Sequence, residues 1–361
     1  MTPAPFSDTD IRWIAAKFGI ESLRVVRVSG GFSGAMVFQV TTRDDLRLAV
    51  RGTPKATALP QTRRRSLHRL LTWLQARDLK CLAVPLRIPN SLDSEIELSE
   101  TIWQIEPWLI GQPAQRHPAP SQMTSALTTL STFYRQARSI PWDDEWFYTA
   151  YEPSPGIQRR RKIVMDLMQS EWTTLYAQVL SLDPCDFRDL AVRSLDAVSK
   201  WSHWLNQSLQ AIEHQAFSLQ PVIRDVWRPH VLFSGDECTG LIDLTASGTD
   251  HPCLDLARLL RSWFGCDTSA IGDAFHEFAE MHGLPHEDRP LFVALDAAAA
   301  LLSPLTWIRR GLETAGLEST GPETGGAGST EPESVRQSPA ALQRLQELTE
   351  LAEAFVPCES L

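Results

Sequence analysis

The residues whose types and spacing best suit chemistry are Asp225, His230 and Asp243. Asp225 lies in the stretch VIRDVWRPHVLF (222–233), where charged and aromatic residues stand between two apolar runs. His230 follows it after five positions, and Asp243 follows it after eighteen, at the end of GLID. Two carboxylates and an imidazole at one rim of a cleft supply a base and metal ligands for phosphoryl transfer. The other interpretation of the same stretch is a polar loop that crosses the end of a sheet.

Two features earlier in the chain suit the binding of phosphate. The stretch SGGFSGA (29–35) is a glycine-rich turn, and glycines let backbone N–H groups approach a phosphate closely. Its candidate nucleotide-binding residues are Gly30, Gly31, Ser33 and Gly34. Arg51 ends the apolar run LAVR and is a cation that can reach phosphates held under this turn. The alternatives are a plain hairpin turn and a solvated arginine at the edge of a sheet.

The spacing of these residues resembles the aminoglycoside phosphotransferase family of the protein-kinase-like fold, which also includes choline and homoserine kinases. In that family a catalytic aspartate is followed after five residues by a magnesium-binding asparagine and after eighteen by a magnesium-binding aspartate. Asp225, His230 and Asp243 occupy those positions. The stretch HPCLDLA (251–257) resembles the family's Asp-Pro-x-x-Asp-Leu-Ala segment. The glycine turn and Arg51 fall where the family has its nucleotide loop and its phosphate lysine.

The resemblance implies an ATP-dependent phosphotransferase that acts on the hydroxyl group of a small molecule. Asp225 would orient and deprotonate that hydroxyl, and Asp243 and His230 would hold a metal ion. Asp255 would brace the catalytic loop. The implied cofactors are ATP and Mg²⁺, and the imidazole of His230 also suits Mn²⁺ or Zn²⁺. The sequence does not specify the acceptor.

The sequence departs from the family pattern at several positions. His230 replaces the asparagine, Arg51 replaces the lysine, and no acidic residue between positions 46 and 77 can pair with Arg51. Further differences from the family pattern are Ile223, Trp227 and His251. The alternative hypothesis is therefore a catalytically inactive kinase-like protein that binds a nucleotide or a metabolite.

Hydrophobic periodicity predicts a small antiparallel sheet with one helix, followed by a mainly helical part. The resemblance implies that these two parts are the lobes of an α+β, bilobal kinase-like fold. Residues 1–107 are the expected nucleotide-binding lobe, with strands over 23–28, 36–42 and 46–51, a helix over 60–77 and a hairpin over 94–109. Residues 108–315 are the expected helical catalytic and substrate lobe, with helices near 120–138, 157–182, 192–217, 254–264, 271–282 and 290–312. Apolar runs at 231–233 and 240–243 predict a hairpin within it. The composition of 316–338 predicts a disordered linker, and 339–361 is expected to be a helix.

The composition of the chain limits the kinds of binding partner and the cellular location that we expect. The net charge of −10 argues against nucleic-acid binding, because a polyanion is repelled. The six cysteines form no CxxC pair, and neither a signal peptide nor a membrane span is expected, so we predict a cytoplasmic protein. The basic stretches 63–65 and 159–162 are predicted to be solvated helix faces. The oligomeric state is left open.

Overall fold

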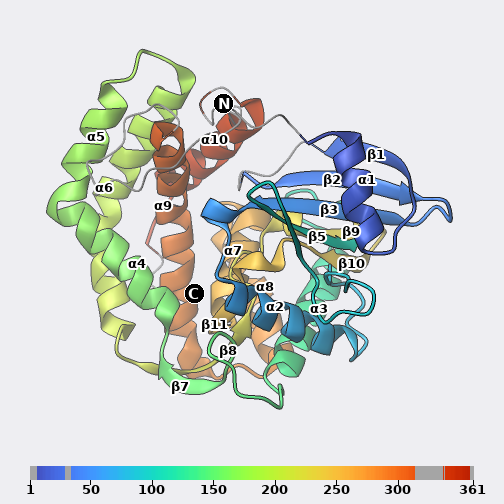
Figure 1. The fold of residues 1–361 in the computed structure, drawn as a ribbon. Coiled ribbons are helices and arrows are strands. Elements are labelled where there is room, and N and C mark those ends of the chain that lie inside the picture. The colour runs from blue at the N-terminus through green and yellow to red at the C-terminus, as the bar shows by residue number, and fades with distance from the viewer. Residues whose placement is uncertain (1–5, 29–33, 314–335, 337, 358–361) are drawn as a thin grey trace.

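A computed structural model describes residues 6–28, 34–313, 336 and 338–357. A twisted sheet near the N-terminus stands beside a larger helical part (Figure 1). This arrangement confirms the predicted α+β bilobal class.

The first 107 residues contain one five-stranded antiparallel sheet, with strand order β1-β2-β3-β5-β4. Its strands are β1 (Ser22–Val28), β2 (Met36–Thr42), β3 (Arg47–Pro54), β4 (Ile96–Leu98) and β5 (Thr101–Pro107). In β3 the alternate residues Leu48 and Val50 are buried, so Arg51 points to the opposite face of the sheet. The register sets Arg51 opposite Gln104 of β5.

Helix α1 (Asp8–Lys17) covers one face of this sheet. It begins with a capping box, in which the side chain of Ser7 and that of Asp10 each accept a hydrogen bond from the other's backbone N–H. Ile11 and Ile14 are fully buried and share a core with the sheet residues Phe38, Val40, Leu48, Val50, Trp103 and Ile105.

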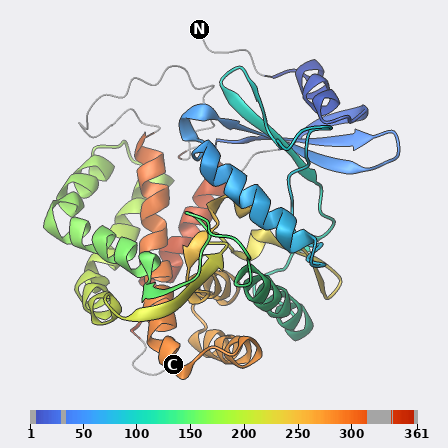
Figure 2. The same ribbon diagram turned by 60° about the horizontal axis from the view of Figure 1, so that its bottom comes forward.

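Helix α2 (Gln61–Gln75) lies between the sheet and the helical part (Figure 2). Its leucines repeat at helical spacing and are buried, but they belong to the core of the helical part: Leu67, Leu70, Leu71 and Leu74. Among its described residues, the first lobe therefore has two α-helices. Helix α1 covers one face of the sheet, whereas α2 lies between the sheet and the helical part and packs on the helical part.

The helical part is built from eight α-helices among the described residues. They are α3 (Pro120–Ala137), α4 (Pro155–Asp166), α5 (Trp172–Leu180), α6 (Asp186–Ile212), α7 (Cys253–Phe264), α8 (Thr268–His282), α9 (Arg289–Glu313) and α10 (Pro339–Glu353). Short strands form two three-stranded sheets among them: β6 (Gln112–Pro113), β7 (Ala150–Pro153), β8 (Ala216–Val222), β9 (Val231–Ser234), β10 (Glu237–Leu241) and β11 (Gly248–Asp250).

The structure corrects two predicted elements of this part. The helix expected over 157–182 is divided by a π-helical turn at Leu167–Glu171. The helix expected over 192–217 ends at Ile212, and Ala216–Val222 form strand β8 between β7 and β11. This strand is buried along most of its length and contains Pro221, so it has neither the alternation nor the composition that identifies a strand. The hairpin β9–β10 is confirmed.

Helices α9 and α10 are the last elements described. The helical stretch His286–Glu313 is long and apolar enough to cross a membrane by composition, but 78% of its apolar window is buried inside the protein. Helix α10 packs on α6 and α9 through buried residues that include Leu345 and Leu348. Most of the predicted linker at 316–338 lies outside the described residues, and the predicted lobe boundaries stay a prediction.

Candidate functional site

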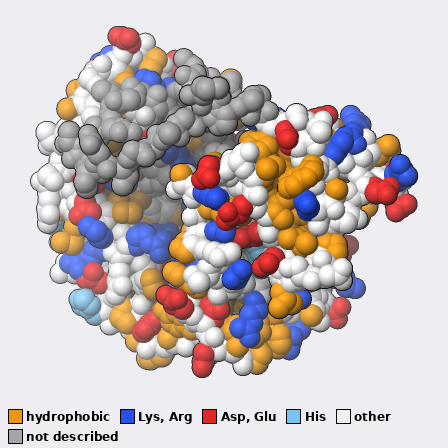
Figure 3. Space-filling model, viewed as in Figure 1, with side chains coloured by type: hydrophobic (Ala, Val, Ile, Leu, Met, Phe, Trp, Pro, Cys, Tyr) orange, Lys and Arg blue, Asp and Glu red, His pale blue; other side chains and the backbone are white. Residues whose placement is uncertain are grey.

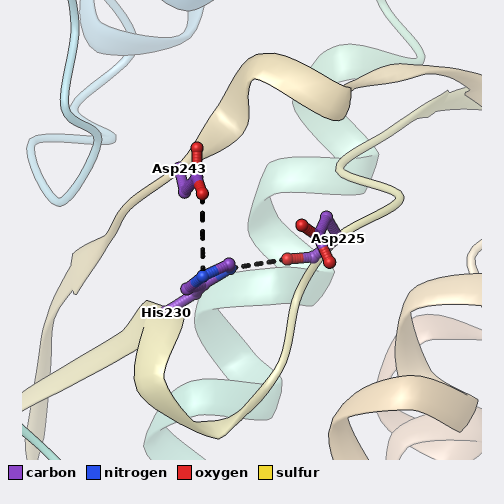
Figure 4. Close-up of side chains that lie close together, drawn as sticks. All are labelled: Asp225, His230 and Asp243. Carbon is purple, nitrogen blue, oxygen red and sulfur yellow. Dashed lines mark hydrogen bonds and ion pairs between the residues drawn. The ribbon is translucent and has the colours of Figure 1, made fainter. Parts of the chain in front are cut away.

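The loop between β8 and β9 brings the candidate catalytic residues together. Asp225 lies three residues after the end of β8, and His230 ends a short 3₁₀ turn that leads into β9. Asp243 follows β10 and has a left-handed backbone, with φ 57°. The ligand atoms of Asp225, His230 and Asp243 lie within 4.8 Å of one another. Figure 4 shows the ring of His230 between the two aspartates.

Both ring nitrogens of His230 are engaged. Nδ1 lies 2.7 Å from the backbone carbonyl oxygen of Asp225, so Nδ1 carries the proton and donates it. Nε2 accepts a hydrogen bond of 2.8 Å from the indole N–H of Trp227. Asp243 Oδ2 lies 3.8 Å from the same Nε2. The imidazole therefore fixes the loop backbone at Asp225, and its Nε2 lone pair points at Trp227.

The protonation state of His230 agrees with these contacts. Burial lowers the pKa of the imidazole, while Asp243 and Asp225 act in the opposite direction without overcoming burial. The ring is therefore neutral at pH 7, as an acceptor Nε2 requires.

An ion pair joins the two lobes at the site. Arg51 Nη2 of β3 lies 2.8 Å from Oδ1 of Asp243. Burial alone would lower the pKa of the Arg51 guanidinium, but Asp243 and Glu106 raise it above its usual value. Burial alone would raise the pKa of the Asp243 carboxyl, but Arg51 and His230 hold it below its usual value. Both groups are charged at neutral pH, so the predicted phosphate cation and the predicted metal ligand face each other.

Asp255, on the first turn of α7, holds the start of the catalytic loop. Its Oδ2 accepts hydrogen bonds from the backbone N–H of Ile223 at 2.7 Å and from the hydroxyl of Tyr134 at 2.9 Å. Burial raises the pKa of this carboxyl to about 6, although both hydrogen bonds lower it. The geometry suits the bracing role that the resemblance implies.

Asp225 itself is partly open to solvent. Its side chain is 33% exposed, and Oδ1 lies 2.5 Å from Nη2 of Arg258 on α7. The carboxylate is thus oriented by a guanidinium while remaining reachable by a small molecule. The sequence did not single out Arg258, which stands three residues after Asp255 on the same helix.

The glycine-rich turn is described only in part. Gly30, Gly31 and Ser33 lie outside the described residues, and Gly34 has a φ of 72°, which favours glycine. Nothing lies within 4 Å of where a Cβ on Gly34 would stand. The predicted nucleotide contacts of this turn stay a prediction.

A group of arginines lies close to the catalytic loop, and we call it the arginine cluster: Arg63, Arg159, Arg160, Arg224 and Arg258. Arg159 is exposed, and the other four are half-buried. Burial and the charge of Arg159 lower the pKa of Arg63, and burial also lowers the pKa of Arg160 to about 10. The prediction of solvated helix faces at 63–65 and 159–162 is therefore wrong for Arg63 and Arg160. It is also wrong for Arg64 and Arg161, which are half-buried and pair with Glu95 and Glu213. Helical periodicity identifies which residues share a face of a helix. It does not show which polar groups from other elements pack against that face.

The C-terminal helix also reaches the catalytic loop. The guanidinium of Arg344 on α10 lies 4.4 Å from the ring centroid of Trp227, and Arg228 lies 3.7 Å from Glu347. Burial lowers the pKa of Arg344 to about 10, although its hydrogen bond with Glu347 raises it. The apolar face of this helix was visible in the sequence, but its polar contacts with a loop more than a hundred residues away were not.

A family model agrees with the fold and the site. The model described as the phosphotransferase enzyme family matches residues 24–291, which is most of the chain. The chain belongs to this family, and the predicted kinship with the aminoglycoside phosphotransferases is confirmed. None of the curated proteins is detectably similar in sequence.

Solved structures of the same fold include three phosphotransferases. An aminoglycoside phosphotransferase from Alicyclobacillus acidocaldarius has a TM-score of 0.60 and 15% identity, over 98% of this chain and 94% of the other. A spectinomycin phosphotransferase, in complex with ADP and spectinomycin, has a TM-score of 0.58 and 12% identity, with coverages of 98% and 96%. Amicoumacin kinase, in complex with AMP-PNP and Ca²⁺, has a TM-score of 0.60 and 11% identity, with coverages of 96% and 93%. At these identities the likeness shows the fold.

Proposed function

We propose that this protein transfers the γ-phosphoryl group of ATP to a hydroxyl group of a small molecule. The observation that carries the proposal is the convergence of Asp225, His230 and Asp243 at one site, reached by Arg51 from the sheet. Membership of the phosphotransferase family supports it. The nucleotides bound to the spectinomycin phosphotransferase and to amicoumacin kinase support ATP as the donor.

In the proposed reaction, Asp225 accepts a hydrogen bond from the acceptor hydroxyl and takes its proton as the oxygen bonds to the γ-phosphorus. The bond between that phosphorus and the β–γ bridging oxygen breaks, and ADP leaves. A carboxylate suffices as the base because the transition state is loose and depends mainly on positioning. Arg258 fixes the Asp225 carboxylate, and Asp255 fixes the backbone two residues before it.

A divalent cation fits part of this site. Asp243 offers a carboxylate, and oxygen ligands are what Mg²⁺ prefers. His230 fits less well, because its Nε2 lone pair accepts the indole N–H of Trp227 and that contact has to break before the imidazole binds a cation. When bound, the cation neutralises charge on the phosphates. We therefore propose Asp243 as the main metal residue and His230 as a second one only after Trp227 moves.

A cytoplasmic location is part of the same proposal. ATP is abundant there, and the five cysteines in the described part of the chain are all free thiols: Cys81, Cys185, Cys238, Cys253 and Cys266. The acidic net charge supports a small-molecule partner over a nucleic acid.

Asp225→Asn is the decisive test. The amide keeps the size of the carboxylate but cannot take a proton, so ATP turnover in the presence of Mg²⁺ falls by about 100-fold or more. Thermal shift with AMP-PNP and Mg²⁺ remains as large as in the wild type, because Asp225 does not hold the nucleotide. Turnover is measured by coupled release of ADP.

Asp166→Asn is the matched control, because Asp166 pairs with Lys162 on the exposed face of α4, away from the catalytic loop. Its turnover stays at the wild-type level. Equal turnover in Asp225→Asn and the wild type would contradict the proposal. Nucleotide binding without any turnover in the wild type, whichever divalent cation is supplied, would support the inactive binding protein instead.

A further inference from the structure

The arginine cluster carries charge that the described residues do not balance. Three carboxylates act on Arg160, Arg224 and Arg258: Asp225, Asp250 and Asp255. Asp250 and Asp255 are fully buried. Asp250 already accepts hydrogen bonds from the Ser154 hydroxyl and from the His251 N–H. Positive charge is therefore left over beside Asp225, in a chain whose net charge is −10.

Hydrogen-bond donors of the cluster are also left over. The Nε–H groups of Arg63, Arg224 and Arg258 are buried and have no acceptor among the residues that the structure describes. A buried guanidinium donor without an acceptor destabilises the protein, because its bond to water is not replaced. The three donors come from α2, the catalytic loop and α7, and so from three sides of one region.

Arg224 is held in a strained conformation next to Asp225. Its φ is 66°, in the left-handed region that glycine adopts freely, and for other residues this costs on the order of 1–3 kcal/mol. Its guanidinium reaches the carbonyl oxygen of Thr249 and lies against Gly248, where a Cβ would stand 2.6 Å from Nη1. Strain of this kind persists only where the surrounding structure imposes it, and it is concentrated at functional sites.

The other arginines approach the same segment. Arg63 on α2 donates hydrogen bonds to the carbonyl oxygens of Ala246 and Ser247, at 3.4 and 3.1 Å. Arg159 on α4 is exposed, and Figure 3 shows Lys and Arg side chains gathered over this part of the helical lobe. Five guanidiniums are brought together here with three carboxylates, Asp225, Asp250 and Asp255, and an incoming anion would stabilise the remaining positive charge.

We propose that the acceptor of this phosphotransferase is an alcohol that also carries an anionic group, and that Arg63, Arg159 and Arg224 bind that group beside Asp225. This inference rests on the proposed function. The anionic group is a phosphate or a carboxylate, both of which match the fork of a guanidinium. Arg258 of the same cluster contacts the Asp225 carboxylate directly, so an anion held by the cluster brings its own hydroxyl towards that carboxylate. A polycationic acceptor is repelled by the same residues.

The first test uses inorganic phosphate as the probe and the full-length protein saturated with AMP-PNP and Mg²⁺. Phosphate, added at constant ionic strength against chloride, raises the melting temperature of the wild type. In Arg224→Gly and Arg63→Gln its affinity falls about tenfold or more, since each loses a charge-assisted contact. Arg224→Gly also removes the backbone strain, so this variant folds at least as stably as the wild type without the probe.

Arg27→Gln is the matched control, because Arg27 is exposed on β1, at the far edge of the sheet. It keeps the wild-type response to phosphate. The inference is overturned if phosphate has no effect on the nucleotide-saturated wild type, or an equal effect in Arg224→Gly. It is also overturned if Arg224→Gly weakens AMP-PNP binding as much as phosphate binding, because the cluster would then serve the nucleotide.

The second test compares acceptors by the release of ADP. Glycerol 3-phosphate carries a phosphate beside its hydroxyls and glycerate carries a carboxylate, so the two separate the sources of the anion. Turnover with at least one of them exceeds turnover with kanamycin, a polycation, and Arg224→Gly raises the KM for that acceptor with little change in the KM for ATP. Preference for kanamycin would overturn the inference and leave the phosphotransferase function standing. Failure to bind AMP-PNP would instead remove the function on which the inference rests.

Discussion

The hydrogen bond that Trp227 donates determines which atoms of the candidate site are free to bind a cation. Its indole N–H holds the Nε2 lone pair of His230, and Nδ1 of the same ring holds the backbone at Asp225. The departure from asparagine at this position therefore has a structural use that requires no metal. A histidine here can anchor the catalytic loop from both sides of its ring.

Trp227→Phe separates the two uses of His230. The phenyl ring keeps the contact with Arg344 but loses the N–H, so a hydrogen bond of about 1 kcal/mol no longer competes for Nε2. Mn²⁺ then binds the nucleotide-free protein about fivefold more tightly. Mg²⁺ affinity is unchanged, because Mg²⁺ prefers oxygen ligands. Isothermal titration with each metal measures both effects.

Trp201→Phe is the control for this substitution, since Trp201 lies on α6 and packs against Phe355. It leaves both metal affinities at their wild-type values. Equal Mn²⁺ affinities in Trp227→Phe and the wild type would show that His230 does not ligate the metal even when its lone pair is free.

At the scale of elements, helix α10 supports the catalytic loop from the end of the chain. Arg344 stacks on Trp227, and Glu347 pairs with Arg344 at 2.9 Å and lies 3.7 Å from Arg228. The buried face of the helix fixes it on α6 and α9. The loop is thus held by Asp255 on one side and by a distant helix on the other.

Arg344→Ala tests this support. Removal of the guanidinium frees the ring of Trp227 to move, so the catalytic loop is less well ordered and kcat falls about fivefold to tenfold. The KM for ATP changes little, because Arg344 makes no contact with Arg51 or Asp243. Steady-state kinetics with ATP and the best available acceptor measure the two constants.

Arg193→Ala is the control for α10, because Arg193 ties the same helix to α6 through Glu353 without touching the loop. It leaves kcat unchanged. A similar decrease in both variants would mean that α10 acts through the general stability of the lobe.

The sequence predicted those elements whose secondary structure is determined by the pattern of their own residues. The helix of α2 and the strands β1 to β3 follow from periodicity, and Asp225 and Asp243 follow from their spacing. Strand β8 was missed because it is buried on both sides and pairs with two short strands distant in the chain. Arg224 and Arg63 were missed because their importance depends on a left-handed backbone angle and on contacts with residues 246–249, neither of which a local pattern shows.

At the scale of the whole molecule, half-buried histidines make the free energy of unfolding depend on pH. Burial lowers the pKa of His68, His230 and His282, to about 4 for His282, where Arg135 also contributes. As the pH falls from 6.5 towards 4, these histidines bind protons in the unfolded chain but not in the folded chain. The free energy of unfolding therefore decreases. Asp255 acts with the opposite sign, because its raised pKa favours the folded state as the pH falls towards 4.

His282→Asn isolates one of these contributions. The wild type loses up to about 1.4 kcal/mol of unfolding free energy per pH unit more than the variant between pH 6.5 and 4. Urea unfolding at several pH values measures the difference, in which the contribution of Asp255 cancels. His214→Asn is the control, since its side chain is 88% exposed, and it matches the wild type. Parallel pH curves for His282→Asn and the wild type would contradict the assignment.

In the nucleotide-free protein, the ion pair between Arg51 and Asp243 competes with the binding of charged ligands at the same site. Each charged group occupies the place that a ligand charge would take, because Asp243 neutralises Arg51 and Arg51 neutralises Asp243. A phosphate and a cation that arrive together can exchange partners with the pair, whereas either one alone must leave a charge unpaired. Under the proposed function, this ion pair would favour the complete metal–nucleotide complex over free nucleotide or free metal, and the same two side chains connect the sheet to the helical part.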